Sequence, residues 1–141
     1  MVAKSFGTIA LSNELARKSF QNAKLIWLTP LLKEDEVFQA MLGSEQEGLY
    51  IIGDADRHYE EARFNELKSN HRLHMHLIKG ANHSLEHDFH VLDSISIHKQ
   101  ILTNIKAFIE AQPRLRFYSF VSVLLHQVSC LALFSIIAKI G

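Results

Sequence analysis

The sequence predicts an α/β fold built on about three parallel strands. Three short apolar runs, at residues 24–28, 48–53 and 72–78, have the length and the β-branched or aromatic content of buried strands. Polar segments of helical character separate these runs. Such alternation is typical of a parallel sheet with helices on its faces. With 141 residues, the chain is long enough for one domain of this kind.

The first half of the chain is expected to form a helix, a strand and a second helix. The first helix is expected over residues 8–19, before the strand at 24–28. Thr29-Pro30 has the form of an N-cap followed by proline at the first helical position. The second helix should therefore begin there and end at Gly43, whose residue type commonly stops helices.

The second half is expected to form two more helices. A polar helix should cover residues 59–69, and the clearest helix should cover about residues 92–111, before Pro113. Apolar positions at helical spacing define one stripe on this last helix, consisting of His98, Ile101, Leu102, Ile105, Phe108 and Ile109. Such a stripe favours packing against the core.

The composition gives expectations about nucleic-acid binding and about the cellular compartment. Fifteen basic and fifteen acidic residues balance, so electrostatics give no reason to expect nucleic-acid binding. The single cysteine, Cys130, excludes an internal disulfide and suits a reducing cytosol. Because no apolar leader follows Met1, a cytoplasmic location is expected.

The chain changes character after Gln112, which predicts a partial α/β domain at residues 1–112 and an apolar tail at 113–141. Residues 117–138 carry no formal charge and are long enough to span a bilayer, so membrane association is one expectation. His126 and Gln127 near the middle weigh against it. The alternatives are an apolar helix packed on the domain and an extension with no evolved role.

Three polar residues stand in short motifs at the ends of predicted elements. Ser5 stands in Ala3-Lys-Ser-Phe-Gly7, and small–x–Ser–x–small is the pattern of a strained strand-to-helix turn that exposes a nucleophile. Asp56 follows the strand at 48–53, and His83 follows the strand at 72–78. Because the carboxyl ends of parallel strands share one edge of a sheet, Asp56 and His83 are expected to be neighbours.

Serine, aspartate and histidine in this chain order resemble the triad of the α/β-hydrolase family. The resemblance runs from Ala3 to about Glu110 and covers the C-terminal half of that fold, from the nucleophile elbow onward. It implies a serine hydrolase that acts on an ester or similar small acyl substrate. The residues it assigns are Ser5 as nucleophile, Asp56 as the acid, His83 as general base and the backbone N–H of Phe6 as an oxyanion donor. Asp54 is the alternative acid.

The family's first half has no counterpart here, since only Met1 and Val2 precede Ala3. In the family, a loop of that half carries the second oxyanion donor, and loss of one donor costs about 10²–10³ in turnover. Weak or no activity is therefore expected. The strand at 24–28 should have an open edge, which favours self-association. The alternative function is a non-catalytic remnant or a membrane-tethered module.

No metal and no cofactor are expected. His74 and His76 alternate on a predicted strand, and His83 and His87 lie four apart in a predicted loop. Catalytic zinc requires three protein ligands that converge on one point, and no spacing here matches a zinc motif.

Overall fold

The computed structural model describes residues 1–15 and 20–111. The chain divides into two units, Met1–Ile109 and Glu110–Gly141. The predicted tail at 113–141 and its uncharged stretch at 117–138 lie outside the described residues. Within the described ranges, no helix combines the length and the apolar character needed to cross a membrane.

The first unit is an α/β domain around one parallel sheet of four strands, in the order β1-β2-β3-β4. The strands are β1 (Val2–Lys4), β2 (Leu25–Leu28), β3 (Gly48–Gly53) and β4 (Leu73–Ile78). The three predicted strands are therefore present, with bounds close to those expected. The α/β class is confirmed, with one strand more than the sequence predicted.

The additional strand, β1, corrects the expectation of an open edge on β2. Val2 pairs with Ile26 and Lys4 with Leu28, so β1 covers that edge. The amide of Ile26 also donates to the carbonyl of Met1 at 2.8 Å, which extends the ladder to the first residue. Three residues are enough to form this strand, because the N–H and C=O groups along the edge of β2 need hydrogen-bond partners. On this side of the sheet the edge strand is therefore β1 and not β2.

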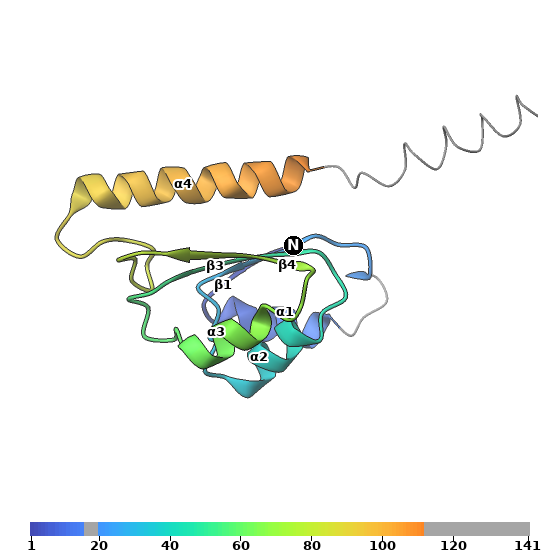
Figure 1. Ribbon diagram of the computed structural model, residues 1–141. Helices are drawn as coiled ribbons and strands as arrows, with labels where there is room; N and C mark the ends of the chain where they lie inside the picture. The colour runs from blue at the N-terminus through green and yellow to red at the C-terminus, as the bar shows by residue number, and fades with distance from the viewer. Residues whose placement is uncertain (16–19, 112–141) are drawn as a thin grey trace, which may run out of the picture. The chain divides into compact units, whose positions relative to one another are not determined.

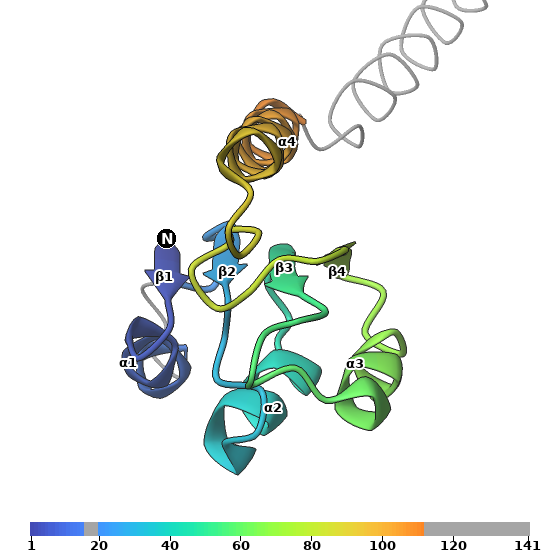
Figure 2. The ribbon, with the colours of Figure 1, turned by 90° about the vertical axis from the view of Figure 1, so that its left-hand side faces the viewer.

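Helices cover both faces of the sheet, as Figures 1 and 2 show. One face carries α1 (Gly7–Glu14), α2 (Asp35–Leu42) and α3 (Glu61–Leu67), and the other carries α4 (Val91–Glu110). Residues alternate between the two faces along each strand, as the period of a strand requires. Leu25 and Trp27 belong to the core under α1–α3, and Ile26 belongs to the core under α4.

The prediction that Thr29-Pro30 begins a helix was wrong. Thr29 has a φ of 42° and donates its amide to the carbonyl of Ile51 at 2.8 Å, so it continues the β2–β3 pairing. The helix α2 begins six residues later, at Asp35. Asp35 and Glu36 place negative charge in its first turn, where the helix dipole favours it.

The sheet contact of α4 is made by Ile97, Ile101 and Phe108, which are buried, and by the partly buried Ile105. The predicted stripe was only partly right, because Leu102 and Ile109 are 66% and 59% exposed. Near the end of α4, Lys24 donates to the carbonyl of Phe108 at 2.7 Å. A cation is favourable there, because the last carbonyls of a helix lack helical partners.

The side chain of Asn70 closes the C-terminal end of α2. Its amide nitrogen lies 3.0 Å from the carbonyl oxygen of Met41, 3.1 Å from that of Leu42 and 3.0 Å from that of Ser44. Its Oδ1 accepts from the amide of Arg72 at 3.1 Å. One side chain therefore holds the α2–β3 and α3–β4 connections together.

Replacing Asn70 with alanine should lower the free energy of unfolding by about 1–3 kcal/mol, since it leaves several partly buried groups without partners. Asn70→Asp keeps the shape but loses the donors, so it should destabilise at least as much. Asn13→Ala, on the exposed side of α1, serves as control. Urea denaturation followed by circular dichroism measures the changes. An Asn70→Asp variant as stable as the parent would contradict this role.

Candidate active site

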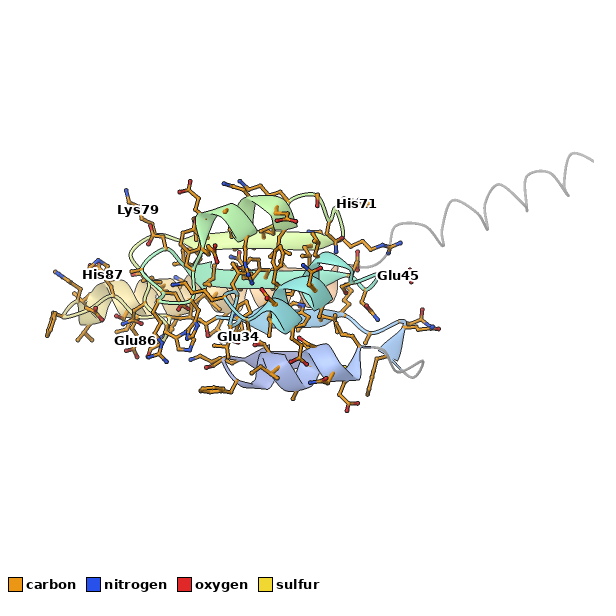
Figure 3. The ribbon with its side chains drawn as sticks, turned by 90° about the horizontal axis from the view of Figure 1, so that it is seen from below. Glu34, Glu45, His71, Lys79, Glu86 and His87 are labelled. Carbon is orange, nitrogen blue, oxygen red and sulfur yellow. The ribbon has the colours of Figure 1, made fainter. Side chains whose placement is uncertain are left out.

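The loops that follow the strands gather at one end of the sheet. Figure 3 shows Lys79, Glu86 and His87, which follow β4, at one end, and Glu45 and His71, which precede β3 and β4, at the other. Ser5, Asp56 and His83 follow β1, β3 and β4. The parallel topology therefore brings all three to the carboxyl edge of the sheet, where open α/β sheets hold their sites.

Ser5 occupies a strained turn between β1 and α1. Its φ is 51°, in the left-handed region that residues other than glycine rarely adopt. Its amide donates to the carbonyl of Leu28 at 3.1 Å, and its carbonyl accepts from the buried Thr8 hydroxyl at 2.5 Å. The amide of Leu31 in turn donates to that hydroxyl at 3.4 Å. Strain of this kind persists only where neighbours enforce it, and β2 and the loop after it do so here.

The small residues on either side of Ser5 approach each other closely. A Cβ atom added at Gly7 would lie 3.9 Å from the Cβ of Ala3, which is ordinary van der Waals contact. The turn therefore brings the end of β1 and the start of α1 together, as the predicted motif requires.

The structure joins Ser5, His83 and Asp56 in one chain of hydrogen bonds. Ser5 Oγ lies 2.9 Å from His83 Nε2, and His83 Nδ1 lies 2.9 Å and 3.0 Å from the two carboxylate oxygens of Asp56. An ionised carboxylate only accepts hydrogen bonds, so Nδ1 carries the imidazole proton. The other nitrogen, Nε2, is then free to accept the proton of the serine hydroxyl.

The side chain of Asp56 is fully buried, and its charge is compensated there. Besides His83, it accepts the backbone amide of His58 at 2.8 Å. A buried carboxylate needs such partners, because desolvation without them is costly. Nearby, burial and, to a lesser extent, the charge of Asp56 raise the pKa of Tyr50, so this phenol stays neutral.

Asp54, the alternative acid, has a different contact. Its Oδ1 accepts the amide of Gly80 at 2.6 Å, which links the turn after β3 to the turn after β4. Asp56, and not Asp54, hydrogen-bonds the imidazole of His83. The sequence left open which of the two carboxylates contacts His83, and the geometry shows that it is Asp56.

His58 is part of the site and was not among the residues predicted for it. Its ring lies 5.0 Å from the ring of His83, and its Nε2 accepts from Arg57 Nε at 3.1 Å. Burial is the main cause that lowers the pKa of His58, which favours its neutral form beside His83. One sequence signal could have indicated this contact. His58 lies two residues after Asp56, and aspartate side chains often accept the backbone amide of the second residue after them.

The backbone N–H of Phe6, the residue after Ser5, lies at the start of α1. Phe6 has helical φ and ψ of −57° and −27° and immediately follows the turn at Ser5. Within residues 1–15 and 20–111, no acceptor takes this N–H. An N–H group at the start of a helix carries partial positive charge, so it is suited to a developing oxyanion.

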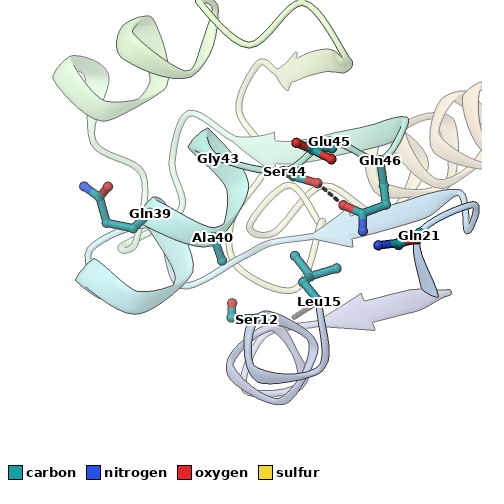
Figure 4. Close-up of a pocket in the computed structure, with 9 residues that line it drawn as sticks. All are labelled: Ser12, Leu15, Gln21, Gln39, Ala40, Gly43, Ser44, Glu45 and Gln46. Carbon is teal, nitrogen blue, oxygen red and sulfur yellow. Dashed lines mark hydrogen bonds between the residues drawn. The ribbon is translucent and has the colours of Figure 1, made fainter. Parts of the chain in front are cut away.

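A pocket of about 340 Å³ lies at the opposite edge of the sheet (Figure 4). It is lined by Ser12, Leu15, Gln21, Gln39, Ala40, Gly43, Ser44, Glu45 and Gln46. Its floor includes a hydrogen bond of 2.9 Å from the Ser44 hydroxyl to Gln46. Because residues 43–46 precede β3, this pocket lies at the end of the sheet opposite to Ser5.

Comparisons with known proteins support the fold. No family model and no curated protein matches the chain. A similar solved structure is a protein of unknown function from Agrobacterium tumefaciens that has been assigned provisionally to the α/β hydrolases, with a TM-score of 0.53 and 20% identity. The match covers 79% of this chain and 53% of that protein, so the chain spans about half its length. The chain therefore shares, distantly, part of the fold of an α/β hydrolase.

Proposed function

We propose that the chain carries the nucleophile, base and acid of a serine hydrolase that acts on an ester or similar acyl substrate. The observation that carries the proposal is the continuous hydrogen-bond chain Ser5–His83–Asp56, with Ser5 held at a φ of 51°. A serine hydroxyl is a weak nucleophile at neutral pH and needs such a base, oriented by a carboxylate.

In this mechanism Ser5 Oγ attacks the acyl carbonyl while its proton passes to His83 Nε2. The resulting oxyanion accepts the N–H of Phe6. When the tetrahedral intermediate collapses, His83 gives its proton to the departing alkoxide and leaves Ser5 acylated. A water molecule, deprotonated by His83, then attacks the acyl-enzyme, and His83 returns that proton to Ser5 Oγ as the acid product leaves. Asp56 keeps the imidazole in the required tautomer and stabilises its cation.

The test is covalent labelling of Ser5 by a fluorophosphonate. We expect one adduct on Ser5, lost in Ser5→Ala and kept in Ser12→Ala, whose serine lies on the adjacent helix α1 and donates to Thr8. Tandem mass spectrometry locates the adduct. If a folded chain is not labelled at Ser5, or Ser5→Ala is labelled as well, the proposal fails.

Turnover of a short-chain activated ester should be slow even if labelling succeeds. Within the described residues we assign one backbone donor, that of Phe6, and an oxyanion hole with one donor fewer loses about 10²–10³ in kcat. Labelling and turnover thus distinguish the two candidate functions. Labelled Ser5 with measurable turnover favours the hydrolase, whereas an unreactive Ser5 in a folded chain favours the non-catalytic remnant.

A further inference from the structure

The loop between His83 and α4 brings a second group of reactive side chains together. His87, His90 and Asp93 each offer one ligand atom, and these three atoms lie within 4.8 Å of one another. His87 is on the loop, and Asp93 is in the first turn of α4. The triad uses none of these three residues.

We propose that His87, His90 and Asp93 bind a divalent transition-metal ion of the zinc type. Two imidazoles and one carboxylate match the protein ligands of open zinc sites, in which water takes the fourth position. Tetrahedral Zn²⁺, with bonds of about 2.0–2.1 Å, places its ligand atoms about 3.4 Å apart. The ligand atoms therefore need to converge by up to about 1.4 Å, which rotation of the exposed His90 and Asp93 side chains allows.

The side chains of His90 and Asp93 can rotate to bring their ligand atoms closer to that of His87. His90 and Asp93 are exposed, and His90 Nδ1 already lies 3.8 Å from an Asp93 carboxylate oxygen. The ring of His87 meets that of His90 at right angles, with centroids 4.7 Å apart. The carboxylate of the neighbouring Asp88 instead accepts from Asn82 at 2.6 Å.

The first ligand, His87, is held more firmly. Its backbone amide donates to the Ser94 hydroxyl at 2.9 Å, which ties the loop to α4. Its ring lies against Gly80, where an added Cβ would come within 2.9 Å of His87 Cδ2 and 3.2 Å of its Nε2. Its Nδ1 lies 3.3 Å from the carbonyl of Asp88. An imidazole that donates through Nδ1 to a carbonyl presents Nε2 to a metal, as metal-binding histidines commonly do.

A bound ion would fasten the loop to the first turn of α4. His83 lies four residues before His87 on that loop, so the ion would also restrict the segment that carries the triad histidine. An ion that binds only the folded state raises its stability by mass action. Binding should weaken at acid pH, because metal ligands must be deprotonated.

The test is calorimetric titration of the full chain, prepared without a polyhistidine tag, with a zinc salt near neutral pH. We expect one saturable site and a higher melting temperature with zinc. His90→Ala and Asp93→Asn should each raise the dissociation constant more than about 10-fold. Both residues are exposed, so these variants should keep the fold, which circular dichroism checks.

Two control variants locate the ion. His98→Ala removes another exposed histidine of α4, and His83→Ala removes the triad histidine; both should bind zinc as the parent does. The proposal is overturned if no saturable binding occurs, if His90→Ala and Asp93→Asn bind like the parent, or if only His83→Ala loses the ion. Because the readout is binding, it is independent of whether Ser5 is reactive.

Discussion

Gly53→Ala should destabilise the domain by about 3 kcal/mol or more, the upper end of the usual cost of overpacking. A Cβ at Gly53 would lie 1.8 Å from the carbonyl oxygen of Ala81 and 2.5 Å from its carbonyl carbon. Both are backbone atoms, so no side-chain rotation can relieve the overlap. The end of β3 and the loop before His83 would have to separate.

Gly7→Ala is the matched control, because its Cβ meets nothing closer than 3.9 Å. Gly7 opens α1, where alanine should be neutral or stabilise by about 0.4–1 kcal/mol. Thermal unfolding compares the two, and a loss of about 1 kcal/mol lowers Tm by roughly 4–8 °C in a domain of this size. Equal melting temperatures for both variants would contradict the close approach of Gly53 and Ala81.

Asp56→Asn should slow fluorophosphonate labelling of Ser5 by about 10⁴-fold, the loss of kcat that the same change causes in a Ser-His-Asp triad. An amide can present its N–H₂ to His83 Nδ1, which would move the imidazole proton to Nε2. His83 could then no longer accept the proton of Ser5. The fold should survive, because asparagine has the shape of aspartate and can still accept the amide of His58.

Asp54→Asn separates this effect from a general loss of charge at the same turn. Its amide oxygen can still accept from Gly80, so labelling should change little. The measurement is the second-order rate constant of labelling for both variants, with circular dichroism to confirm folding. A larger loss in Asp54→Asn than in Asp56→Asn would assign the acid role to the other carboxylate.

The sequence predicts the central strands well because burial on both faces leaves an unmistakable pattern. Every residue of β3 is buried, and its apolar run reads as a strand with no further information. The proximity of Asp56 and His83 follows from the same elements, because parallel strands place their carboxyl ends together. Residue order and topology were therefore enough to bring these two groups together.

Short or edge elements could not be predicted in this way. β1 has three residues and exists because β2 offers it a template, a contact that no local pattern encodes. The exposed Leu102 and Ile109 of α4 have the same hydrophobicity as its buried Ile101. Which of these positions meets the sheet depends on the rotation of the helix, which packing decides.

Details of the candidate site depend on backbone geometry that residue types do not encode. Asp54 and Asp56 are chemically identical, and only the course of the turn directs one to Gly80 and the other to His83. His58 contributes its backbone N–H to Asp56, so its residue type carries no signal for that contact. His87 and His90 come together because Ser94 ties their segment to α4.

Because β1 is a short edge strand, Ser5 is expected to leave its place more often than Asp56 and His83 do. The turns that carry Asp56 and His83 are joined directly, through Gly80 N–H to Asp54 and Ala55 N–H to the carbonyl of Ala81 at 3.2 Å. Ser5 follows β1, which has three residues and a single neighbouring strand, β2. Local opening at an edge costs less than global unfolding. Local opening of β1 is therefore expected to release Ser5 while the contact between Asp56 and His83 persists.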